Sequence, residues 1–111
     1  MEEPMSTKPI VISVMCMTKY GGYNLRTTGD VVDAIKNKHN DKEVFINPSY
    51  IESITIHTQE IVDQYIIDET YNRQVKDRSR EEQYFNINMH RGNSYSVRAC
   101  YWDKFYAELT K

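Results

Sequence analysis

Apolar and polar positions in the first part of the chain predict a buried strand followed by a short helix. Residues 10–17 are mostly apolar or β-branched and precede a Gly-Gly pair, which is typical of a largely buried strand. Thr27 and Asp30 have the spacing of a capping box, in which each side chain accepts a hydrogen bond from the other residue's backbone N–H. Apolar residues then recur at helical spacing up to Ile35, and residues 37–41 supply a stop. We therefore expect one strand, a loop and one short helix here.

The middle of the chain predicts two short strands around an Asn-Pro turn and then a long helix. Residues 43–47 alternate weakly and end at Pro48, whose missing N–H favours a turn. A third strand is expected over residues 51–56. Between residues 58 and 80 the apolar positions are spaced by four, which favours a helix capped by Thr58. The residues with this spacing are Ile61, Val62, Tyr65, Ile66, Ile67, Tyr71 and Val75.

Two alternating segments near the end of the chain predict a β-hairpin. Apolar residues alternate with polar ones through residues 84–90 and again through residues 94–100. A two-residue turn would put the two apolar sets on opposite faces, so we expect a three-residue loop at 91–93. This register also places Asn86 opposite Arg98 on the polar face. The expected apolar pairs are Met89 with Tyr95, Ile87 with Val97 and Phe85 with Ala99.

Together these elements predict an α+β fold, with an antiparallel sheet of about five strands and one short and one long inserted helix. Residues 101–109 fit a closing amphipathic turn or short helix. A chain of 111 residues suffices for one hydrophobic core, so we expect a single domain over 1–111 with a flexible tail at 1–7. Apolar residues lie on more than one face of the long helix, which predicts self-association as a dimer or higher oligomer.

Charge and hydropathy narrow the classes of function. The formal net charge is only −2, so we do not expect nucleic acid or an anionic membrane as a partner. The longest apolar segment, residues 10–17, is well short of the roughly 20 residues of a membrane span. The start of the chain is acidic, unlike a signal peptide. Cys16 and Cys100 have no metal-ligand spacing, so we expect two reduced thiols in a cytoplasmic protein.

The nucleophilic and titratable side chains form no catalytic motif. His39, His57 and His90 are far apart, and none lies in a Cys/His or His/Glu motif. No serine or cysteine has a neighbouring base of the kind that activates a nucleophile. We therefore expect no enzyme activity, no metal ion and no cofactor.

Two basic groups are candidates for binding an anion. The first is the segment 19–26, in which Lys19, a Gly-Gly pair and Arg26 precede the expected helix. The free N–H groups at a helix start favour phosphate. This segment matches neither of the common phosphate-binding fingerprints, and the alternative is an ordinary exposed loop.

The second basic group belongs to the closing hairpin. Arg91 and Arg98 carry guanidinium groups that match phosphate, Asn93 lies in the loop, and Tyr101 follows shortly after. Aromatic rings stack on bases, so this group would suit a nucleotide. The alternative is that Arg98 only bonds Asn86 across the strand pair. The candidate ligand-binding residues are Arg26, Arg91, Asn93, Arg98 and Tyr101.

Residues 44–54 and 91–105 resemble segments of FlbD-type small β proteins, many of them encoded by phages. The shared patterns are hydrophobic-Asn-Pro-x-x-Ile-x-x-Ile and Gly-x-x-Tyr-x-Val, and the two segments cover about a quarter of the chain. The chain departs from that family by a helical insertion before Asn47-Pro48 and a longer one between Ile56 and Tyr84, so the family's function is not carried over.

A small β-sheet with such helical additions resembles the Thoeris anti-defence family of phage sponges. That resemblance implies a non-catalytic protein of the host cytoplasm that sequesters a cyclic nucleotide signal, either a cyclic ADP-ribose isomer or a cyclic oligonucleotide, in pockets between protomers. The alternatives are a protein-directed phage inhibitor, such as an anti-CRISPR protein, that uses the same tyrosine-rich surface, and a small nucleic-acid-binding β-barrel. The low net charge argues against the barrel.

Overall fold

The computed structural model describes residues 8–17 and 22–111 and has an α+β fold. The expected tail at residues 1–7 lies outside this part of the chain. Short 3₁₀ turns at Lys38–Asn40, Pro48–Tyr50 and Ala99–Tyr101 connect some of the main elements. The main elements are β1 (Ile10–Val14), α1 (Thr28–Lys36), β2 (Lys42–Ile46), β3 (Ile51–Asp68), β4 (Arg73–Met89), β5 (Ser94–Arg98) and α2 (Trp102–Leu109).

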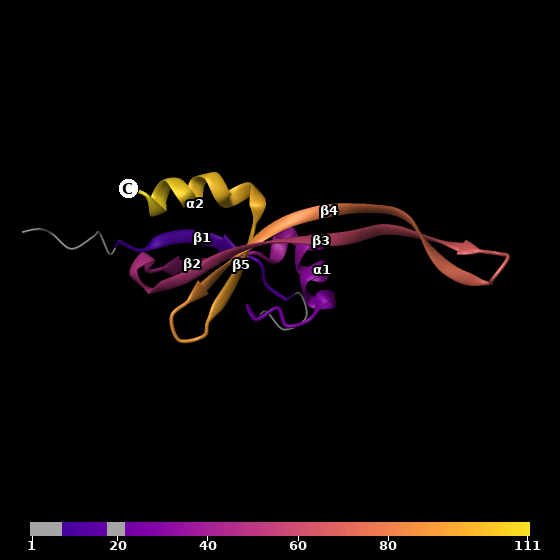
Figure 1. Cartoon of the computed structure of the whole chain (residues 1–111), viewed down its shortest axis with the longest axis horizontal. Coiled ribbons are helices and arrows are strands. Elements are labelled where there is room, and N and C mark those ends of the chain that lie inside the picture. The colour runs from indigo at the N-terminus through magenta and orange to yellow at the C-terminus, as the bar shows by residue number, and fades with distance from the viewer. Residues whose placement is uncertain (1–7, 18–21) are drawn as a thin grey trace, which may run out of the picture.

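The five strands form two antiparallel sheets instead of the single sheet that we expected. One sheet pairs β1 with β2, and the other has the order β3-β4-β5. Just after β1, the backbone N–H of Met15 donates a hydrogen bond of 2.8 Å to the carbonyl oxygen of Ser96 in β5. This bond joins the two sheets, and α2 lies over one side of the assembly (Figure 1).

Our prediction of a long helix over residues 58–80 is wrong, because this segment is the outer part of a β-hairpin made by β3 and β4. A spacing of four residues fits a helix face, but it also fits one face of a strand, where every second residue points the same way. The β-branched residues Ile61, Val62, Ile66 and Ile67 favour the strand.

A turn that we did not recognise joins the two long strands. The carboxylate of Asp68 accepts a hydrogen bond of 3.0 Å from the backbone N–H of Thr70, and Asn72 has a positive φ of 48°. Aspartate and asparagine favour this geometry because their short polar side chains bond to nearby backbone and tolerate left-handed conformations. This turn ends β3 at Asp68 and reverses the direction of the chain.

The closing hairpin has the expected faces but a register shifted by two residues. Ile87 lies opposite Tyr95 and Phe85 lies opposite Val97, so the apolar side chains do share one face. Met89 closes the loop with Asn93, which makes 90–92 the three-residue loop instead of 91–93. The predicted cross-strand position of Asn86 is therefore also wrong. Its partner is Ser96, whose hydroxyl donates a 2.7 Å hydrogen bond to the Asn86 side chain.

Two apolar clusters hold the body together. The larger lies between the two sheets and α2, where Phe105 is almost fully buried and contacts Phe85. The smaller lies beneath α1 and contains Ile61 from β3 and Met15. The predicted capping box of α1 is confirmed: Thr27 accepts from the Asp30 N–H at 3.1 Å, and Asp30 accepts from the Thr27 N–H at 3.2 Å.

The molecule is elongated, with extents of 74 × 26 × 23 Å. Figure 1 shows why: β3 and β4 leave the body together and project as a long two-stranded arm, while the other elements gather around their base. No helix in residues 8–17 and 22–111 is long and apolar enough to cross a membrane.

Candidate functional site

A hollow of about 420 Å³ lies at the end of the body opposite the tip of the arm, beside the turn that joins β4 to β5. Segments that are distant in the sequence converge there: the end of β2, the 3₁₀ turn Pro48–Tyr50 and the closing hairpin. Aromatic and polar side chains line it. They include Phe45, Tyr50 and Tyr95, together with His90, Arg91 and Asn93.

The Asn-Pro turn fixes one wall of the hollow. The side-chain oxygen of Asn47 accepts a 3.0 Å hydrogen bond from the backbone N–H of Ser49, and Pro48 supplies the backbone angle of the turn. The carbonyl oxygen of Tyr50 then accepts a 2.6 Å hydrogen bond from the backbone N–H of His90. The turn before β3 is thereby fastened to the turn after β4.

The second wall is the β4–β5 turn, which holds Arg91 in an unfavourable conformation. The Met89 N–H donates a 2.7 Å hydrogen bond to the Asn93 carbonyl, and inside this closure Arg91 and Gly92 have φ values of 75° and 92°. Glycine adopts such angles freely, whereas a residue with a Cβ loses on the order of 1 kcal/mol. Non-glycine residues held in this region cluster at functional sites, so Arg91 is a candidate for a side chain with a role in binding.

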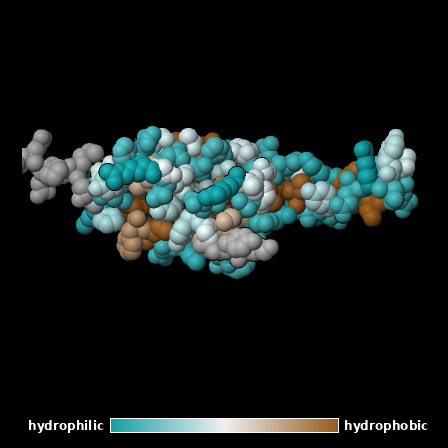
Figure 2. Space-filling view, turned by 90° about the horizontal axis from the view of Figure 1, so that it is seen from below, coloured by the Kyte–Doolittle hydropathy of each residue, from teal (hydrophilic) through white to brown (hydrophobic). Residues whose placement is uncertain are grey.

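The aromatic rings around the hollow are unusually open to solvent. Phe45 is 76% exposed and Tyr50 is 59% exposed, whereas Tyr95 is half-buried and held by an edge contact with Tyr23 at 5.9 Å between ring centroids. Phe45 lies in β2 between Val44 and Ile46, so strand alternation turns it to the outer face. Figure 2 shows hydrophobic surface gathered at this end of the body and again along the arm.

The charges at the rim are mixed. Arg91 supplies a positive group, and His90 lies 3.9 Å from the carboxylate of Glu52, with both side chains exposed. The positive group of Arg91 would attract an anionic ligand, and the carboxylate of Glu52 would repel one.

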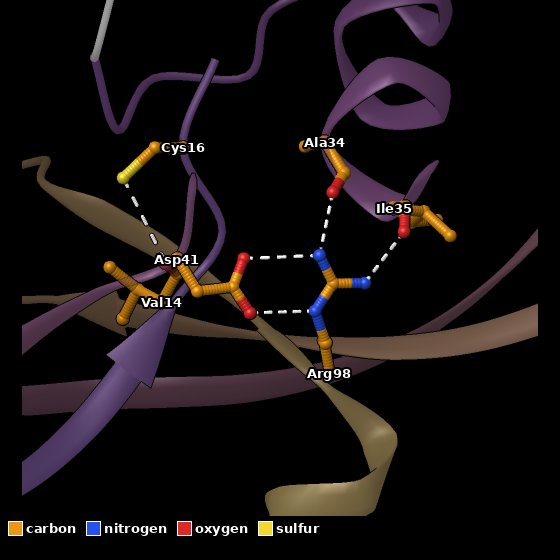
Figure 3. Close-up of polar contacts among 6 residues, drawn as sticks. All are labelled: Val14, Cys16, Ala34, Ile35, Asp41 and Arg98. Atoms are coloured by element: carbon orange, nitrogen blue, oxygen red, sulfur yellow. Dashed lines mark hydrogen bonds and ion pairs between the residues drawn. The ribbon is translucent and has the colours of Figure 1, made fainter. Parts of the chain in front are cut away.

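Arg98, the second predicted arginine, is engaged inside the protein (Figure 3). Its guanidinium group forms a two-pronged contact with the Asp41 carboxylate at 2.6 and 3.0 Å. It also donates to the carbonyl oxygens of Ile35 at 2.8 Å and Ala34 at 2.7 Å, which belong to the last turn of α1. The Arg98 and Asp41 side chains are only 12% and 8% exposed. Arg98 therefore ties β5 to α1 and to the segment before β2.

The structure brings together only part of the predicted site. Arg91 and Asn93 line the same hollow, whereas Arg98 lies beside a different one and Tyr101 borders a third, small hollow between β1 and α2. Arg26 precedes α1, where its backbone N–H donates to Asp30 at 3.1 Å. In the anion-binding segment 19–26, residues 19–21 lie outside the described part of the chain.

Our sequence analysis missed Phe45, Tyr50, His90 and Tyr95. One signal could have identified Phe45: it occupies the same outward phase of its strand as Glu43, which is an unusual place for a large apolar ring. Tyr50 and His90 meet because the β3–β4 pairing puts Ile51 opposite Met89 and continues in the His90–Tyr50 backbone bond, so no local pattern reports their meeting.

No family model, curated protein or solved structure that we compared with the chain matches it. Among residues 8–17 and 22–111, no three His, Cys, Asp or Glu side chains are grouped as a metal ion would require.

Proposed function

We propose that this protein is a non-catalytic binding protein that sequesters a nucleotide, with the hollow beside the β4–β5 turn as its ligand site. The observation that carries the proposal is the meeting of two solvent-exposed rings, Phe45 and Tyr50, with a conformationally strained arginine, Arg91, around one concavity. The long helical addition on which the resemblance to phage sponges partly depended is the β3–β4 hairpin, so the choice of a nucleotide as ligand depends on these residues.

Each of these groups suits one part of a nucleotide. A base stacked on Phe45 or Tyr50 gains about 1–3 kcal/mol, whichever base it is. The guanidinium group of Arg91 matches two phosphate oxygens, and the amide of Asn93 can donate to and accept from the edge of a base. Arg98 is not part of this site, because its bonds to Asp41 and α1 already occupy it.

A protein-directed inhibitor is the second candidate. Its support is the same pair of exposed rings, since Tyr, Phe and Arg are enriched in protein interfaces. Such a partner would cover the hollow as part of a wider contact.

Thermal unfolding and calorimetry with a panel of cyclic dinucleotides, cyclic trinucleotides and cyclic ADP-ribose isomers test the first candidate. A true ligand at a hundredfold excess over its dissociation constant should stabilise the fold by about 2.7 kcal/mol. Phe45→Ala and Arg91→Asn should each weaken binding at least tenfold; asparagine tolerates the left-handed backbone, so the second change removes only the guanidinium group. Lys104→Ala removes an exposed basic group of α2 that does not line the hollow, and this control should bind normally.

Two results would contradict the proposal. If no nucleotide in the panel stabilises the protein, the protein-directed candidate takes its place. If chromatography shows that a bound nucleotide is converted to a product during incubation, the protein is an enzyme and the non-catalytic assignment is wrong.

A further inference from the structure

The outer part of the β3–β4 arm, residues 63–80, is the most exposed regular structure in the described chain. Strand β5 covers β4 only from Tyr84 to Asn88, so beyond that point β4 pairs with β3 alone. Helix α1 reaches β3 as far as Val62, whose carbonyl accepts a 2.9 Å hydrogen bond from Lys36. The distal arm, as we call residues 63–80, is therefore a two-stranded ribbon with two open edges (Figure 1).

Both faces of the distal arm carry large apolar side chains. Tyr65 and Ile67 are two residues apart in a regular stretch of β3 and share one face, where Ile67 is 64% exposed. Ile66 lies on the other face, directly opposite Val75 of β4. Tyr71 in the turn is 69% exposed. An isolated two-stranded hairpin is marginally stable in water, and exposed apolar surface of this extent marks a surface that another molecule covers.

The two strands of the distal arm carry opposite charge. Residues 63–68 of β3 hold two aspartates and no basic residue, whereas residues 73–80 of β4 hold four basic residues and one aspartate. With Glu69 in the turn, the distal arm has four acidic and four basic residues and no net charge. It therefore offers no basic stripe to nucleic acid.

Lys76 and Arg80 already pair with Glu60 and Asp63 inside the hairpin, and the remaining opposite charges make the distal arm complementary to a second copy of itself. Placing β3 beside β3, or β4 beside β4, of another copy would oppose like charges across the contact, which is unfavourable. Placing β3 of one copy beside β4 of another opposes unlike charges and continues the antiparallel alternation of strand directions. Open strand edges are ready templates for such pairing.

We propose that the distal arm is a self-association surface on which β3 of one copy lies beside β4 of a second copy. The contact would extend the ribbon into the second copy, with Tyr65 and Ile67 on one face and Ile66 on the other beside the apolar side chains of that copy, and its repetition would give both open edges a partner. The inference does not depend on the ligand proposed above, because the distal arm and the hollow lie at opposite ends of the molecule.

Sedimentation velocity over a range of protein concentrations is the first test. The wild-type protein should sediment as a dimer or larger species in the micromolar range. Ile67→Lys puts a charge into the contact and should weaken association at least tenfold. Val11→Lys changes an exposed apolar residue of β1, on the body, and should leave association unchanged.

A charge-exchange experiment tests the orientation. One variant carries Asp63→Lys and Glu69→Lys, which leaves the Asp68 carboxylate bonded in the turn, and the other carries Arg73→Glu and Arg78→Glu. Each variant alone should lose association, because its distal arm then carries a net charge of one sign and repels a second copy of the same variant. An equimolar mixture of the two variants should regain association. Both variants should keep the melting temperature of the body, since the exchanged charges are exposed and exposed ion pairs contribute little to stability.

Three results would overturn the proposal. A wild-type protein that stays monomeric at every concentration would make the distal arm a docking surface for a foreign protein. Association that survives Ile67→Lys would place the interface elsewhere. Association of either charge variant alone at wild-type strength, or a mixture that stays monomeric, would exclude the pairing of β3 with β4.

Discussion

Arg98 joins three segments of the body through one largely buried guanidinium group. The sequence marked this arginine as an anion-binding residue, and it does bind an anion, but the anion is the Asp41 carboxylate of the same chain. Asp41 lies 57 positions away, so no local pattern could have distinguished an internal partner from a ligand. The same guanidinium group also donates to the carbonyls of Ala34 and Ile35 in the last turn of α1, where the ordinary helical hydrogen bonds run out.

Replacing Arg98 should therefore destabilise the fold. We expect Arg98→Ala to lower the free energy of unfolding by roughly 3 kcal/mol or more, because it leaves the Asp41 carboxylate buried without its partner. Arg98→Lys should recover only part of this loss, since an ammonium group cannot reproduce the two-pronged contact. Urea unfolding measures both values. Lys104→Ala, at an exposed position of α2, serves as the control and should change stability by less than about 0.5 kcal/mol.

The two thiols should differ sharply in reactivity. Burial raises the pKa of Cys16 above its usual value of 9.0, while Cys100 is exposed. The thiolate is the reactive form, so near pH 8 a thiol reagent should modify Cys100 quickly and Cys16 only when the protein opens. With a reagent that releases a coloured thiolate, absorbance follows the modification of both cysteines. Cys100→Ser should abolish the fast phase, and rapid modification of Cys16 in the folded protein would contradict its burial.

At the scale of elements, the sequence predicted those features that depend on a few neighbouring residues. The capping box at Thr27 and Asp30, the Asn47-Pro48 turn and the helix after Tyr101 are of this kind. The long helix failed because a four-residue spacing fits both periodicities. The register of the last hairpin failed by two residues because the alternation fixes which face a side chain occupies and leaves open how far the strands slide.

The capping box offers a direct measure of what such a local signal contributes. Thr27→Ala removes the oxygen that accepts from the Asp30 N–H and should lower the free energy of unfolding by about 1 kcal/mol. Thr27→Ser keeps that oxygen and should be nearly neutral. Thermal or urea unfolding gives both values, and equal losses in the two variants would show that the methyl group, and not the hydrogen bond, is responsible.

The whole molecule joins a packed body to a nearly unsupported ribbon, and this contrast was hidden from the sequence. The periodicity of β3 and β4 cannot show that these strands extend beyond the rest of the sheet. Their lengths have to be compared with those of the other strands, which lie elsewhere in the chain. Local sequence patterns likewise reveal only part of the candidate site. Arg91 and Asn93 were within reach of local reasoning, while Phe45 and Tyr50 join them only through the meeting of two turns.

The body and the distal arm should therefore differ in local stability. In amide hydrogen exchange, backbone N–H groups in residues 63–80 should exchange much faster than those of β1 and β5 in a dilute sample, because few buried contacts oppose their opening. Raising the protein concentration should slow exchange in the distal arm alone if copies pair there. Uniform protection along β3 and β4 in a monomeric sample would show that the ribbon is stable by itself.

Strand β3 begins immediately after Tyr50, at the hollow, and continues for 18 residues to the tip of the arm. At about 3.3 Å per residue it spans nearly 60 Å. A paired strand cannot shorten without losing its ladder, so β3 keeps the hollow and the tip of the arm at a set separation.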